Sequence, residues 1–314
     1  AEDNYRIKTN MSGMNPKRFK NAINNGFHYQ YMMNTLQKNN GNETFSEVSQ
    51  LANISNTDWS WAPLLADLDN DGHRDLFVTN GFPKDVTDHD FIMYRFKAFS
   101  YVLKSQLLKE IPEVKIHNYV FKNNGNLGFE DKSIEWGFDA PSFSNGAVYA
   151  DLDNDGDLDF VINNINDKAF LYRNNSREEQ ADKSHYLRVK FKGDQKNLQG
   201  FGAKIEGIFE NGERFYYENT PYRGYLSSVE PVAHIGLGTK RKLKEIHIVW
   251  PNDKMQVIKK PGVDQMLTVS MDAAKEPYQT LFEANKPLLK RCDAWLAVYK
   301  SNVGRGGMQL RVTA

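Results

Sequence analysis

Two nine-residue stretches of this chain concentrate aspartate: DLDNDGHRD at 67–75 and DLDNDGDLD at 151–159. In each stretch, aspartates occupy positions 1, 3, 5 and 9, and glycine occupies position 6, where the backbone must turn sharply. This spacing is typical of calcium loops, in which carboxylates and a backbone carbonyl at position 7 surround the ion. The predicted ligands of two Ca²⁺ ions are the side chains of Asp67, Asp69, Asp71 and Asp75 with the carbonyl of His73, and the side chains of Asp151, Asp153, Asp155 and Asp159 with the carbonyl of Asp157.

These loops differ from EF-hand loops, which need a glutamate at position 12 and a helix on each side. Position 12 is Val78 in the first loop and Ile162 in the second, and both residues lie in predicted strands. A solvated acidic turn without metal is the alternative, but two matches in the same register favour a metal site. Calcium is expected rather than magnesium, because a nine-residue cage made of protein ligands suits the larger, geometrically tolerant cation.

The acidic loops belong to a longer internal repeat. Residues 34–80 and 118–164, which are offset by 84 positions, are identical at 18 of 47 positions. The identities concentrate in the KNNGN segment, in the phenylalanine that follows it and in the acidic loop. A repeated segment of this length predicts a duplicated structural unit.

Each repeat predicts strands joined by turns. The NNGN segment is a hairpin signal, and the runs LFVTN and DFVINN behind the loops are β-branched and aromatic at strand length. The segment 81–117 interrupts this pattern with helical apolar spacing, a Thr87-x-x-Asp90 start and Pro112 beyond its end. We therefore expect a helical insertion at about 85–112 between two β units.

The character of the chain changes after residue 184. Short runs of alternating pattern, such as HYLRVKFKG and KEIHIVWPNDKMQVIK, with an Asn211-Gly212 hairpin turn between two of them, predict a second all-β domain at 184–272. The first domain is assigned to 1–180. The remainder, 273–314, is a tail with one predicted helix at about 287–299.

Composition excludes some classes of partner. Lysine plus arginine and aspartate plus glutamate number 40 each, so no net charge argues for nucleic acid. No apolar run reaches the length of a membrane span, so no transmembrane segment is expected, and the first residues lack the basic and apolar regions of a signal peptide. The single cysteine, Cys292, excludes an internal disulfide framework.

With its NNGN turn and acidic loop, the segment 39–81 resembles an FG-GAP or VCBS-type repeat, the blade unit of integrin-like β-propellers. The segment 202–258, which begins GAKIEG and ends with IVWPNDKMQVI, resembles an ASPIC/UnbV domain, and the helical insertion is similar to a Bacteroidetes subgroup. The resemblance implies an all-β fold: a partial propeller followed by a small β-sandwich-like domain. It also implies an extracellular, periplasmic or outer-membrane location and no enzymatic chemistry. Such propellers usually have about seven blades, whereas two full units are visible in this chain.

Two further groups of residues have alternative interpretations. The aspartates of DVTDHD, Asp85, Asp88 and Asp90, are either a carboxylate acid/base site or the start of a helix that Thr87 caps. Several aromatic and basic residues are either a platform on which sugar rings stack or part of the packing between blades. These residues are Trp59, Trp61, Tyr222, Arg223 and Tyr225.

The sequence therefore predicts a calcium-binding, non-catalytic extracellular or cell-surface module that interacts with a protein or a glycan. A polysaccharide-active enzyme with a calcium-stabilised propeller scaffold is the alternative, and a purely structural part of a larger assembly is a third possibility.

Overall fold

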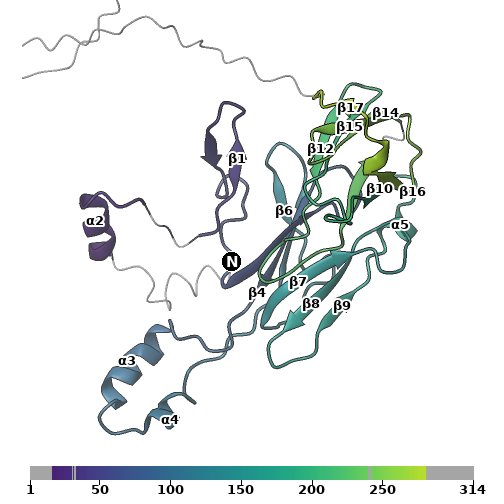
Figure 1. Cartoon of the computed structure of the whole chain (residues 1–314). Helices are drawn as coiled ribbons and strands as arrows, with labels where there is room; N and C mark the ends of the chain where they lie inside the picture. The colour runs from purple at the N-terminus through teal and green to yellow at the C-terminus, as the bar shows by residue number, and fades with distance from the viewer. Residues whose placement is uncertain (1–15, 30, 32, 240–241, 281–314) are drawn as a thin grey trace, which may run out of the picture.

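The computed structural model describes residues 16–29, 31, 33–239 and 242–280 (Figure 1). It is mostly β, with several small sheets and few helices, as expected. The predicted helix at 287–299 and Cys292 lie outside the described residues. Within the described part of the chain, no helix is long and apolar enough to cross a membrane.

The first repeat forms a four-stranded antiparallel sheet, called here the first repeat sheet. Its strands lie in chain order: β3 (Ser60–Ala66), β4 (Asp75–Asn80), β5 (Tyr119–Asn123) and β6 (Phe129–Asp131). The first acidic loop connects β3 to β4. Strand β4 is buried along its whole length, and in β3 burial alternates with exposure over the last five residues.

The second repeat forms a three-stranded antiparallel sheet, the second repeat sheet, from β7 (Ser144–Ala150), β8 (Asp159–Asn164) and β9 (Phe170–Tyr172). Its first hairpin has the same register as the first hairpin of the other sheet. Ser60 pairs with Asn80 and Ser144 with Asn164, and a register shift follows at the same place in both hairpins. The second acidic loop connects β7 to β8, so the sequence duplication is a structural duplication.

The KNNGN segment at the start of the first repeat forms a separate hairpin of β1 (Gln37–Asn39) and β2 (Phe45–Glu47). These strands correspond by the 84-residue offset to the last three residues of β5 and to β6. All six of their residues are exposed. The described residues therefore contain two repeat sheets and one outer hairpin, and they do not form a closed propeller.

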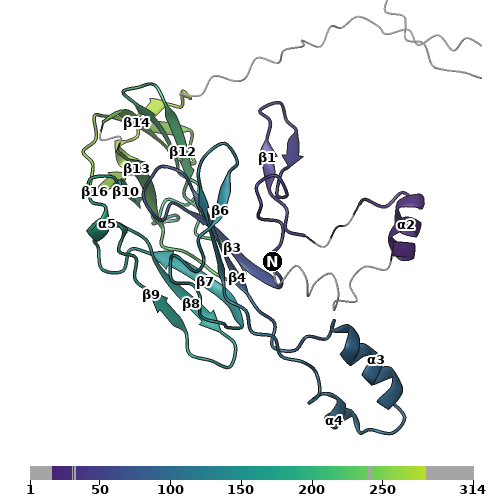
Figure 2. The same cartoon turned by 180° about the vertical axis from the view of Figure 1, so that it is seen from behind.

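The predicted helical insertion is present between β4 and β5 as α3 (His89–Ala98) and α4 (Lys104–Leu107). In both views these helices stand away from the sheets (Figures 1 and 2). The predicted N-cap was wrong by one residue. Asp88, not Thr87, caps α3, because its carboxylate accepts the backbone N–H of Phe91 at 2.8 Å. The structure adds a short helix, α2 (Pro16–Asn24), that the sequence patterns did not predict.

The second domain consists of two sheets that share one core. The first sheet has the order β13-β10-β16 and the second the order β12-β11-β14-β15-β17. All pairs are antiparallel except β10 with β16, and the Asn211-Gly212 turn joins β11 to β12 as expected. The bounds are β10 (His185–Lys192), β11 (Lys204–Phe209), β12 (Arg214–Glu218), β13 (Val232–Gly238), β14 (Leu243–Val249), β15 (Lys254–Lys259), β16 (Gln265–Ser270) and β17 (Glu276–Pro277), with α5 (Ser176–Glu179) before β10 and a 3₁₀ turn (Met271–Ala273) after β16.

The two repeat sheets are held together by a common apolar core. Phe77 of β4 lies at its centre, 1% exposed, with its ring centroid 4.6 Å from that of Phe160 and 5.2 Å from that of Phe138. Val229 of the second domain joins the same core. The core therefore fixes the distance between the two hairpins that carry the acidic loops.

We expect Phe77→Ala to lower the free energy of unfolding by about 3–5 kcal/mol, because it leaves a cavity between the two sheets. Phe45→Ala is the matched control, since Phe45 in β2 is 61% exposed, and it is expected to change stability by less than about 0.5 kcal/mol. Urea unfolding followed by near-UV circular dichroism measures both. Equal losses in the two variants would contradict the placement of this core.

Candidate metal centre

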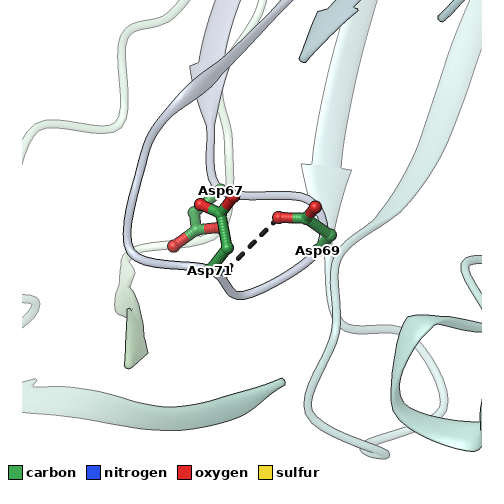
Figure 3. A group of neighbouring side chains, drawn as sticks. All are labelled: Asp67, Asp69 and Asp71. Atoms are coloured by element: carbon green, nitrogen blue, oxygen red, sulfur yellow. Dashed lines mark hydrogen bonds between the residues drawn. The ribbon is translucent and has the colours of Figure 1, made fainter. Parts of the chain in front are cut away.

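The first acidic loop brings three predicted ligands together (Figure 3). Carboxylate oxygens of Asp67, Asp69 and Asp71 lie within 4.8 Å of one another. Asp67 is 7% exposed; its Oδ2 accepts the N–H of Gly72 at 2.9 Å, while its Oδ1 is buried without a hydrogen-bond partner among the described residues. A buried carboxylate oxygen without a donor is costly, and it fits a cation ligand.

The second loop repeats this arrangement with Asp151, Asp153 and Asp155, whose carboxylate oxygens also lie within 4.8 Å of one another. Asp151 is 6% exposed and its Oδ2 accepts the N–H of Gly156 at 3.1 Å. In the described part of the chain its Oδ1 is again buried without a hydrogen-bond partner. In both loops, 84 residues apart, Oδ1 of the first-position aspartate is therefore buried without a hydrogen-bond partner among the described residues.

The ninth-position aspartates have a different set of contacts. Asp75 accepts the N–H of Leu68 at 3.0 Å with one oxygen and that of Asn123 at 2.8 Å with the other. Asp159 does the same, accepting from Leu152 and Asn174, both at 2.9 Å. Each carboxylate thus bonds the second residue of its own loop and a residue further along the chain, which is the last residue of β5 in the first repeat and lies just after β9 in the second. Neither belongs to the close groups of three.

The seventh-position residues stabilise the turn through their backbone. His73 donates its N–H to Oδ1 of Asp71 at 2.8 Å, and Asp157 donates its N–H to Oδ1 of Asp155 at 3.1 Å. The Asp157 side chain is buried and accepts the N–H of Arg177 at 3.0 Å. This contact joins the second loop to α5.

The negative charges of the carboxylates in each loop repel one another, and several of the carboxyl groups have raised pKa values. Burial, with the neighbouring aspartates, raises the pKa of Asp67 well above its usual value, and burial raises the pKa of Asp75 to about 7. Burial also raises the pKa of Asp151, although Arg188 opposes this rise, and raises the pKa of Asp157 to about 7. A divalent cation would offset this repulsion, so the donor set fits calcium.

Asn70, at position 4 of the first loop, joins the two loops and the second domain. Its side-chain amide donates to the carbonyl of Gly156 at 3.0 Å, and its backbone carbonyl accepts the N–H of Gly238 at 2.6 Å. Burial, with Arg188 nearby, lowers the pKa of His234 to about 3, so His234 is neutral and its Nε2–H donates to Asn70 Oδ1 at 2.6 Å. Sequence reasoning missed this residue because asparagine at a loop turn signals only a positive φ.

Arg188 of β10 makes the corresponding link for the second loop. Its guanidinium is buried and donates to Asp151 Oδ2 at 2.7 Å and to Glu230 Oε2 at 2.6 Å. On the side of the first loop, a Cβ at Gly236 of β13 would collide with the Asp67 carboxylate. Both loops therefore lie directly against the β13-β10-β16 sheet of the second domain.

The aromatic candidates form one contiguous group except for Tyr222. Trp59 and Trp61 both stack on Phe82, with centroid distances of 5.1 and 6.3 Å, and Trp61 contacts Tyr225 at 4.8 Å. Trp61, Phe82 and Tyr225 line a hollow of about 690 Å³. Tyr222 is exposed and Arg223 is partly buried on the same loop.

The aspartates considered for acid/base chemistry start the insertion. Asp85 is buried and accepts both the backbone N–H and the hydroxyl of Thr87 with one oxygen, at 3.0 and 2.7 Å. Asp88 is the N-cap of α3, and Asp90 is exposed in its first turn. These contacts place the three aspartates at a helix start.

Two acidic, strand-flanked loops in a duplicated hairpin, packed on a two-sheet β domain, define a repeat protein with loops suited to calcium. Residues 24–78 match the FG-GAP-like repeat family, and residues 193–276 match the family described as ASPIC and UnbV. The resemblance drawn from the sequence is thereby confirmed for both parts. The second acidic loop lies outside both matched ranges. A search of curated proteins found no match.

We expect Asn70→Ala to destabilise the protein by about 2–4 kcal/mol more than Asn154→Ala, because it leaves buried donors and acceptors without partners. Asn154 is the matched control: it holds the same position in the second loop and has nearly the same φ, 63° against 58°, but it is exposed. Urea unfolding in the presence of EDTA gives the difference. Equal losses would show that only the turn conformation matters at Asn70.

Proposed function

We propose that this chain is a calcium-binding, non-catalytic module that acts outside the cytoplasm by presenting a surface to a partner. The observation that carries the proposal is the pair of buried carboxylate oxygens, Asp67 Oδ1 and Asp151 Oδ1, which have no donor within the described residues. Each belongs to a residue whose carboxylate lies close to two further carboxylates. Calcium is plentiful outside cells, where loops of this kind function with weak affinity.

The ions would be structural. The residues that would hold them are Asp67, Asp69 and Asp71 in one loop and Asp151, Asp153 and Asp155 in the other. A bound cation would supply positive charge against the repulsion of these carboxylates. Because both loops contact the second domain through Asn70 and Arg188, occupied loops would hold the repeats and the ASPIC/UnbV domain in one arrangement.

The partner surface is assigned to the hollow around Trp61 and Tyr225. Aromatic faces of this kind bind the apolar faces of sugar rings, and the serine and asparagine side chains of Asn145, Asn163 and Ser227 line the same hollow. We therefore favour a glycan, with a protein segment as the other partner expected from the sequence. The alternative of a polysaccharide-active enzyme loses support, because Asp85 and Asp88 are engaged in local contacts at a helix start.

Calcium binding predicts a rise of the thermal unfolding midpoint when calcium is added to EDTA-treated protein, because the ion binds only the native state. At a calcium concentration 100 times the Kd, the stabilisation per site is about 2.7 kcal/mol. Asp69→Asn and Asp153→Asn should each remove part of the rise, and together nearly all of it. Asp90→Asn, an exposed aspartate outside the loops, is the control and should keep the full rise. An unchanged midpoint in the wild type would refute calcium binding.

Glycan binding predicts that the protein binds members of a glycan array in calcium. Trp61→Ala should reduce this binding by about tenfold, because a stacked aromatic contact worth about 1.4 kcal/mol is lost. Leu171→Ala, an exposed apolar residue outside the hollow, is the control. Binding that survives Trp61→Ala would place the glycan elsewhere, and a blank array would leave the protein partner.

A further inference from the structure

A basic side chain lies over each acidic loop. In the first loop, Lys122 of β5 donates its Nζ–H groups to Asp69 Oδ2 and, at 2.8 Å, to Asp71 Oδ2. These are the third- and fifth-position carboxylates. The ammonium group therefore occupies oxygens that a calcium ion would use.

The second loop has the same arrangement with arginine. Arg173 donates from Nε to Asp153 Oδ2 at 2.7 Å, and its Nη2 lies 3.7 Å from Asp155 Oδ2. It also pairs with Glu178 of α5 at 2.5 Å. Again the contacts are to positions 3 and 5 of the loop.

The repeat itself places these two cations. Each is followed by an asparagine, Asn123 or Asn174, whose N–H binds the ninth-position aspartate of the same loop. The hydrogen bond fixes the strand against the loop, and the preceding side chain then reaches the carboxylates. Lys38 has the equivalent position in β1, where no acidic loop lies beside it in the described part of the chain.

The two cations are accessible from one cavity. Asp69, Lys122 and Arg173 line a cavity of about 670 Å³ between the repeat sheets. The Lys122 side chain is 23% exposed and the Arg173 side chain 53% exposed, so solvent screens the arginine more strongly. The ammonium group of Lys122, the guanidinium group of Arg173 and the carboxylate of Asp69 are therefore all open to an ion that enters this cavity.

We propose that Lys122 and Arg173 are tethered counter-cations: each competes with calcium for the third- and fifth-position aspartates and keeps its loop folded when calcium is absent. The inference rests on the proposed calcium binding. It explains how a loop of four carboxylates persists without metal, and it makes calcium affinity weaker than the ligand set alone would give. The effect is stronger at Lys122, which is the more buried of the two.

The test is calorimetric titration with calcium in an Asp153→Asn background, so that the first loop supplies the measured site. We expect Lys122→Gln to bind calcium roughly tenfold more tightly, because a like charge a few ångströms from the ion is removed, and to unfold at a lower temperature in EDTA. Lys122→Arg keeps the charge and should stay within about twofold of the background. Lys38→Gln is the matched control and should change neither quantity.

Equal or weaker calcium affinity in Lys122→Gln would overturn the inference while leaving calcium binding intact. Absence of binding in the unmutated loops would overturn both proposals together. If Lys122→Gln does not fold in EDTA, its affinity is measured by titrating a chelator into the calcium-loaded protein. The same comparison for Arg173→Gln in an Asp69→Asn background should show a smaller gain in affinity.

Discussion

The structure depends on the burial of two aspartates, Asp67 and Asp151, where the repeat sheets meet the second domain. A buried carboxylate is unfavourable unless donors or cations surround it. Backbone N–H groups of the loops and the guanidinium of Arg188 meet part of this need. One oxygen of each carboxylate remains without a donor among the described residues, and both carboxylates lie where the loops contact the second domain.

The negative charges of the two loops are paired with different cations, although the loop sequences are nearly identical. The second loop has Arg188 against its first aspartate and Arg173 against its third-position aspartate. The first loop has Lys122 against its third- and fifth-position aspartates, while Asp67 lies against the backbone of Gly236 and forms no ion pair with another described residue. Among the described residues, the first loop therefore has more uncompensated charge than the second.

Local sequence was sufficient to predict the strands around the loops, the Asn-Gly hairpin and the helical insertion, because spacing and turn chemistry act over a few residues. Of the four aspartates predicted as ligands in each loop, those at positions 1, 3 and 5 lie close together, while the ninth-position aspartate does not join them. The contacts between the acidic loops and the second domain were not predictable from local sequence. Asn70 contacts residues 86 and 164 positions away, and Arg188 lies in an alternating strand where a charged residue is expected to face solvent. The choice of Asp88 over Thr87 as the cap depended on backbone geometry that both residue types allow.

The most direct measurement of the central claim is amide hydrogen exchange with calcium and with EDTA. If the loops join the repeats to the second domain through calcium, the ion should slow exchange in both acidic loops and also in β10 and β13, which contact them. Exchange in β1, β2 and α3 should stay unchanged, since these elements lie outside the junction (Figures 1 and 2). Protection confined to the loops, or none at all, would contradict the account.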